Sequence, residues 1–94
     1  MPEHPNVRRF LDLSTAHMKP RTRAEWGLAA PGHVHPTEYG FFVWAGDHED
    51  DETDEGWPPE VTACRRFARS LGCDYLLFDG DADTVEGLEV FDDE

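Results

Sequence analysis

Three aspartates at alternate positions, Asp79, Asp81 and Asp83, follow an apolar run and form the segment most suited to chemistry. Alternating carboxylates could hold Ca²⁺, but a calcium loop needs Gly at its sixth position and Glu at its twelfth, where this chain has Thr84 and Val90. A phosphotransferase nucleophile at Asp79 would need a large Mg²⁺-binding scaffold, and only 11 residues follow Asp83. Since Asp and Gly favour turns, we expect this segment to be a polar turn between strands.

Three histidines, His17, His33 and His35, indicate a second kind of site. His33 and His35 lie two residues apart in an expected strand, so both side chains project from the same face. Together with His17 they could bind Zn²⁺ if the fold brings them together. Nothing in the spacing requires this, so we expect ordinary histidines and keep metal binding as an alternative function.

No pairing of nucleophile and base in the sequence indicates an enzyme. Ser14, Thr15 and His17 lack the Gly-x-Ser-x-Gly turn that would expose a nucleophile. Cys73 lies beside Asp74 and has no basic neighbour to stabilise a thiolate. We therefore expect a protein that acts by binding rather than by catalysis, and that needs no cofactor.

The charge balance is the strongest signal in the sequence. The 94 residues include 8 Lys and Arg against 21 Asp and Glu, which gives a net charge of −13. Residues 38–94 carry three basic and eighteen acidic side chains, a net charge of −15. Such a field repels nucleic acid and anionic membranes and speeds encounters with basic surfaces. We expect a basic protein surface as the partner, with no direct binding to nucleic acid or membrane.

Much of the negative charge lies in residues 46–57, which we expect to form a mobile, solvated loop. A small domain needs a net charge of only about 2–8 for solubility, so the excess suggests that the charge itself is the ligand. B-DNA carries about one negative charge per 1.7 Å of its axis, and a carboxylate array can imitate it. The predicted partner-binding residues are Asp47, Glu49, Asp50, Asp51, Glu52, Asp54 and Glu55, with Trp57 as an apolar anchor and Asp79, Asp81 and Asp83 as a second patch.

The predicted function is that of an acidic inhibitor that occupies a basic surface of a nucleic-acid-processing or host-defence protein, in the manner of a DNA mimic. The first alternative is an acidic module in a complex without nucleic acid, such as a toxin antidote. The second is the small metal-binding protein already described. The sequence leaves the oligomeric state open.

Residues 1–94 are expected to form a single α+β domain of the cytoplasm. Two cysteines are too few for a disulfide framework, and neither a signal peptide nor an apolar run of membrane-spanning length is present. Apolar periodicity predicts strands at 9–17, 33–35, 40–45, 75–78 and 88–91 and helices at 20–30 and 59–71. We expect the two helices to cover one face of a mainly antiparallel sheet, with the β-α-β-β-α-β connectivity of a ferredoxin-like sandwich.

Two details of that prediction bear on the surface of the domain. All four residues between Gly40 and Ala45 are apolar, which predicts a central strand covered on both faces. In the second helix, Val61, Cys64, Phe67, Ala68 and Leu71 form an apolar stripe. Arg65, Arg66 and Arg69 are expected on the opposite, solvent-facing side.

Three segments resemble a known group of proteins: residues 13–17, residues 36–43 and residues 67–79, which read LSTAH, PTEYGFFV and FARSLGCDYLLFD. They resemble the small acidic proteins of unknown function carried on plasmids and integrated elements of proteobacteria. The resemblance spans most of residues 11–92 and departs at Gly80. It implies a mobile-element context, in which such proteins serve conjugation, plasmid maintenance or the blocking of host defences. It transfers no catalytic residue.

Overall fold

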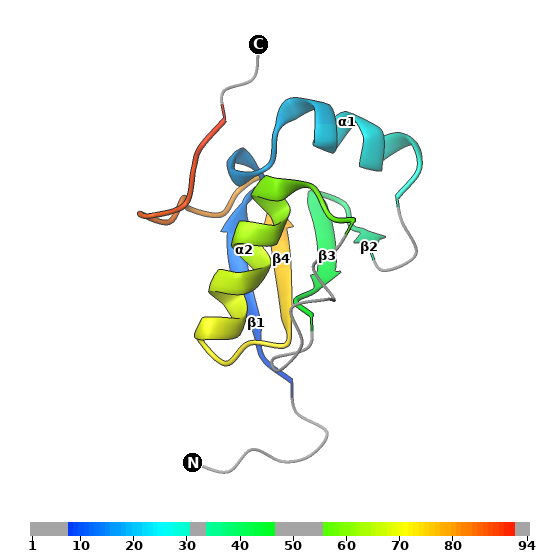
Figure 1. The fold of residues 1–94 in the computed structure, drawn as a ribbon. Coiled ribbons are helices and arrows are strands. Elements are labelled where there is room, and N and C mark those ends of the chain that lie inside the picture. The colour runs from blue at the N-terminus through cyan, green and yellow to red at the C-terminus, as the bar shows by residue number, and fades with distance from the viewer. Residues whose placement is uncertain (1–7, 31–33, 47–55, 92–94) are drawn as a thin grey trace.

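The structure, a computed structural model, describes residues 8–30, 34–46 and 56–91, and these form an α+β fold. The elements in chain order are β1 (Phe10–Ser14), the short 3-10 helix η1 (Thr15–His17), α1 (Pro20–Leu28), β2 (Val34–Pro36), β3 (Gly40–Trp44), α2 (Pro59–Ser70) and β4 (Tyr75–Asp79). The predicted class and the predicted β-α-β-β-α-β order of elements are therefore confirmed (Figure 1). None of the described helices is long and apolar enough to cross a membrane.

The four strands form one mixed sheet in the order β1-β4-β3-β2. β1 and β4 are parallel, whereas β3 pairs antiparallel with both β4 and β2. The last strand thus lies inside the sheet and the first lies at its edge. In a ferredoxin-like sandwich the first strand is an interior strand, so the strand order here differs from that arrangement although the elements follow one another along the chain in the same order. The connection through α2 also differs, because it joins the adjacent antiparallel strands β3 and β4.

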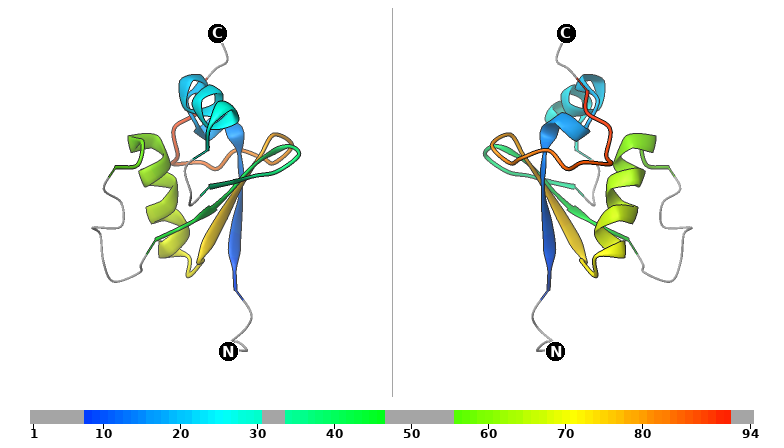
Figure 2. Two further views of the ribbon diagram at one scale, coloured as in Figure 1. Left: turned by 90° about the vertical axis from the view of Figure 1, so that its right-hand side faces the viewer. Right: turned by 90° about the vertical axis from the view of Figure 1, so that its left-hand side faces the viewer.

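The core lies between one face of this sheet and α2, which covers that face (Figures 1 and 2). The sheet contributes alternate side chains, among them Leu13, Val43, Leu76 and Phe78, none of which is accessible to solvent. α1 lies across the end of the sheet (Figure 1) and reaches the same core through Trp26. The Trp26 ring meets the Phe41 ring edge-on, with 5.5 Å between centroids.

Three residues of the predicted stripe, Val61, Cys64 and Ala68, are buried in the second helix. The stripe is wrong at its last residue, because Leu71 follows the helix and is 46% exposed. The helix ends at Ser70, and Gly72 beyond it has a positive φ of 79°, which permits the two backbone bonds of a Schellman cap, Gly72 N–H to Arg69 C=O and Cys73 N–H to Ala68 C=O.

The prediction that Arg65 faces solvent is wrong. Arg65 is fully buried. Two contacts stabilise the buried guanidinium: its Nε donates to the Trp44 carbonyl oxygen at 3.0 Å, and it lies 4.0 Å from the centroid of the Trp57 ring.

The expected final strand at residues 88–91 is also wrong, since this segment joins no strand. It packs against η1 instead, where the Phe91 N–H donates to the Ala16 carbonyl oxygen at 2.8 Å. The first strand is shorter than predicted because Ser14 ends it: the Ser14 hydroxyl accepts from the Ala16 N–H and caps η1.

A candidate interaction surface

The face of the sheet opposite α2 is not covered by any described helix or strand (Figure 2). We call it the open face. Side chains alternate along a strand, so its members follow from the strand register. They are Phe10 and Asp12 of β1, Tyr75, Leu77 and Asp79 of β4, Phe42 and Trp44 of β3, and His35 of β2. The prediction that β3 is covered on both faces is therefore wrong for the described part of the chain.

Aromatic rings form the centre of the open face. The Phe42 and Tyr75 rings are stacked, with centroids 5.0 Å apart and an interplanar angle of 19°. Phe10 meets Phe42 edge-on at 6.1 Å. Phe10 is 52% exposed, while Phe42, Tyr75 and Leu77 are only half-buried. These contacts stiffen the cluster without hiding it, and exposed apolar clusters of this kind usually mark interaction sites.

Carboxylates border the aromatic rings. Asp12 is exposed on β1, and Asp79 closes β4 on the same face. The turn after β4 and the turn between β2 and β3 project on the side of the sheet away from α2 (Figure 2), where the Gly80 N–H donates to the Tyr39 carbonyl oxygen. The open face is therefore apolar at its centre, with one carboxylate at its β1 edge and others at the end of β4.

The predicted polar turn after β4 is confirmed. The Ala82 N–H donates to the Asp79 carbonyl oxygen at 3.1 Å, and the Asp81 N–H donates to the Asp79 carboxylate at 2.9 Å. Asp81 and Asp83 are exposed. Within the described residues, neither carboxylate makes a hydrogen bond or an ion pair. Of the predicted binding residues, the structure thus brings Asp79, Asp81 and Asp83 together beside the open face.

The other predicted binding residues are placed differently. Residues 47–55, which hold the seven predicted loop carboxylates, lie outside the described part of the chain. Trp57 is half-buried and packs against the core, with its ring 6.1 Å from that of Trp26 and under the Arg65 guanidinium. One ring face of Trp57 is therefore already used within the domain.

Both ring nitrogens of His17 are engaged by the backbone. Nδ1 lies 2.8 Å from the Glu89 carbonyl oxygen, and Nε2 lies 2.9 Å from the Val85 N–H. A metal could bind His17 only by breaking one of these bonds. His35 is exposed on β2, one edge of the sheet, whereas His17 follows β1, the opposite edge. His33 lies outside the described residues. No group of three metal-binding side chains is found among the described residues.

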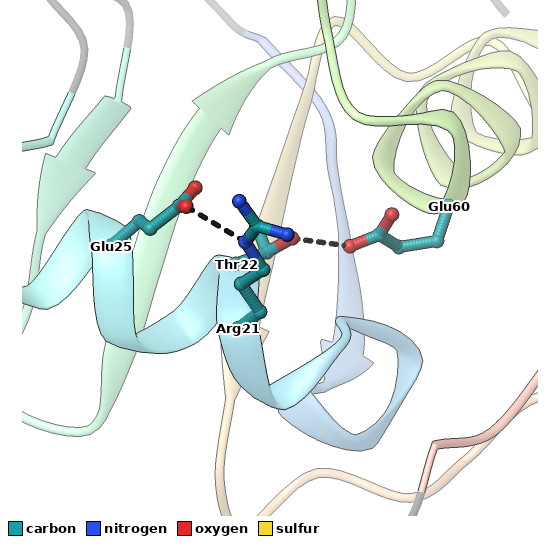
Figure 3. Close-up of polar contacts among 4 residues, drawn as sticks. All are labelled: Arg21, Thr22, Glu25 and Glu60. Carbon is teal, nitrogen blue, oxygen red and sulfur yellow. Dashed lines mark hydrogen bonds and ion pairs between the residues drawn. The ribbon is translucent and has the colours of Figure 1, made fainter.

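A buried carboxylate joins the two helices, away from the open face. Glu60, in the first turn of α2, accepts from the Thr22 hydroxyl at 2.7 Å (Figure 3). It also accepts from the Lys19 N–H at 3.1 Å. In the same figure, Arg21 and Glu25 form an exposed ion pair within α1.

The thiol of Cys64 lies in the core. Its burial, and secondly the charge of Glu60, raise its pKa to about 12. Cys64 is therefore a core residue, as its place in the stripe predicts, and no nucleophile at neutral pH.

Fold and surface together define a small acidic α+β domain with one sheet face that no described helix or strand covers. The model of the C-terminal domain of DUF5983, a family of unknown function, matches residues 10–93. The chain therefore belongs to this family. Comparisons with curated proteins and with solved structures gave no significant match.

The sequence pattern did not identify the aromatic residues of the open face. Phe42 lies in the run predicted to be covered on both faces, and Tyr75 begins the run 75–78, which is also apolar at consecutive positions, a pattern typical of a buried strand. One signal was present: Asp12 lies two residues after Phe10 and Asp79 lies four residues after Tyr75, so in a strand each carboxylate shares a face with an aromatic residue. A carboxylate on a strand marks a face that water reaches.

Proposed function

We propose that this domain is a protein-binding inhibitor of a mobile genetic element, which occupies a basic surface on a nucleic-acid-processing or host-defence protein. The observation that carries the proposal is the set of exposed carboxylates around the open face, none of which is paired among the described residues: Asp12 at its β1 edge, and Asp81 and Asp83 at the end of β4.

Charge on this scale favours a basic partner. Residues 38–94 have a net charge of −15, which opposes folding through self-repulsion and exceeds what solubility needs. Arg forks on a partner would pair with such carboxylates in charge-assisted hydrogen bonds. Association of this kind is fast and weakens steeply with salt. The resemblance to proteins of plasmids and integrated elements supports placing the partner among host-defence proteins.

The aromatic centre of the open face favours a second candidate, an acidic module of a complex without nucleic acid, such as a toxin antidote. Binding would then depend on Phe42 and Tyr75 as apolar anchors, and its salt dependence would be shallow. Both candidates act by binding, and they differ in whether the partner's surface also takes DNA.

A pull-down with a competitor separates the candidates. The domain is immobilised, incubated with a proteobacterial lysate and eluted along a salt gradient or with duplex DNA. A decoy releases a DNA-binding protein at moderate salt and also on addition of duplex DNA. Two variants should retain less of that protein. One carries Asp81→Asn and Asp83→Asn, and in the other the seven loop carboxylates from Asp47 to Glu55 are replaced by amides. Undiminished retention by both variants overturns the acidic-surface model, and retention that resists DNA and salt favours the antidote.

A further inference from the structure

We infer that the open face is the docking surface of this domain and that it takes an apolar protein patch bordered by Lys or Arg side chains. The inference rests on the proposed function for the basic character of the partner and adds where on the domain the partner binds.

The aromatic rings provide the apolar half of the argument. Phe42 is stacked on Tyr75 and braced by Phe10, so the three rings are held in place before binding. Rings that are already ordered lose little conformational entropy when a partner covers them. Aromatic side chains at the centre of an interface are also those that contribute most to affinity.

The carboxylates decide which partner fits. Asp12 lies on the same face as the rings and Asp79 closes it, with Asp81 and Asp83 in the turn beyond. Covering the rings would desolvate the carboxylates beside them, which is costly unless a cation pairs with them. A partner with Lys or Arg around an apolar patch supplies both contacts.

The same carboxylates weigh against two other occupants. A second copy of this chain would bring two domains of net charge −13 together and place carboxylates at the edge of both aromatic clusters. Single-stranded nucleic acid stacks on exposed aromatic rings of sheets, but its phosphates would meet Asp12 and Asp79 in place of the basic groove that such binding needs.

Two synthetic peptides of equal length and arginine content test the inference. One is an amphipathic helix with leucine along one side, and in the other serine replaces each leucine. The domain should bind the leucine peptide about tenfold or more tightly than the serine peptide in fluorescence anisotropy, and Phe42→Ser should remove that preference. Leu28→Ser is the matched control, because Leu28 is a 90% exposed apolar residue in α1 and does not belong to the open face. Phe10→Ser serves as a second variant if Phe42→Ser lowers the melting temperature.

Each other result has a defined meaning. Equal, salt-sensitive binding of both peptides leaves the proposed function standing and overturns the docking surface. Binding of neither peptide overturns both. If the domain binds oligouridine and Phe42→Ser abolishes that binding, the occupant of the open face is nucleic acid. If the domain self-associates in sedimentation and Phe42→Ser abolishes this, the occupant is a second copy of the chain. Asp12→Asn should weaken both peptides equally, whereas an unchanged affinity would contradict the part assigned to the carboxylates.

Discussion

His17 and Val85 are joined by a 2.9 Å hydrogen bond in which the Val85 N–H donates to the imidazole Nε2. Because Nε2 accepts, the proton lies on Nδ1, which donates to the Glu89 carbonyl oxygen at 2.8 Å. The buried His17 ring thus holds the segment after β4 against η1. This segment includes residues 88–91, for which the sequence predicts a strand.

We expect His17→Phe to destabilise the domain by about 2–4 kcal/mol. The substitution keeps an aromatic ring but removes the partner of the Val85 N–H and of the Glu89 carbonyl oxygen at a partly buried site. Urea unfolding at neutral pH measures the loss, and hydrogen exchange at the Val85 amide should accelerate. His35→Phe is the control, since His35 is exposed and should change stability by no more than about 0.5 kcal/mol. Equal effects of the two variants would contradict the role of His17.

Gly40 begins β3 where the backbone of β4 leaves no room for a side chain. A Cβ there would collide with the carbonyl group of Phe78, which the β3–β4 pairing holds in place. We expect Gly40→Ala to cost about 3 kcal/mol or more in thermal unfolding. Gly27→Ala, in α1, meets no atom within 4 Å and should stabilise the domain by about 0.5–1 kcal/mol. A Gly40→Ala variant as stable as the parent would refute the close approach.

Cys64 predicts how stability falls in alkaline solution. Its thiol pKa is raised from 9.0 to about 12 by burial and by the charge of Glu60, so the folded state keeps its proton when the unfolded chain has lost it. Stability from this group is fully present below pH 9.0 and is lost as pH rises toward about 12. The slope approaches about 1.4 kcal/mol per pH unit within that window. Cys64→Ala should remove this slope in urea titrations between those limits, and Glu60→Gln should reduce it. If the unfolding free energy of Cys64→Ala fell with pH as steeply as that of the parent protein, Cys64 would not be the source of the slope.

Salt should stabilise this domain. Its net charge of −13 makes the compact state repel itself, and raising NaCl from about 0.01 M to about 1 M shortens the Debye length from about 30 Å to about 3 Å. The melting temperature should therefore rise with salt. A variant with the seven loop carboxylates from Asp47 to Glu55 converted to amides should melt higher at low salt and gain less from added salt. A melting temperature that falls with salt would show that attractive ion pairs dominate.

Local patterns in the sequence correctly predicted most of the elements. The stripe of Val61, Cys64 and Ala68 identified the inner side of α2, and Gly72 its end, because both depend on residues within a few turns of one another. The acidic turn from Asp79 to Asp83 was predicted for the same reason. The candidate surface was only half predicted: its carboxylates were identified, and its aromatic rings were assigned to the core.

What the sequence alone determined is the class of the fold, the helix that covers the core and the strongly acidic character of the domain. These depend on composition and on periodicity, which act over short stretches of chain. Only the tertiary structure decided that β4 enters between β1 and β3, that Arg65 is buried and that the rings of Phe42 and Tyr75 are only half-buried. A strand's alternation tells which side chains share a face, but what covers that face depends on contacts between residues far apart in the chain.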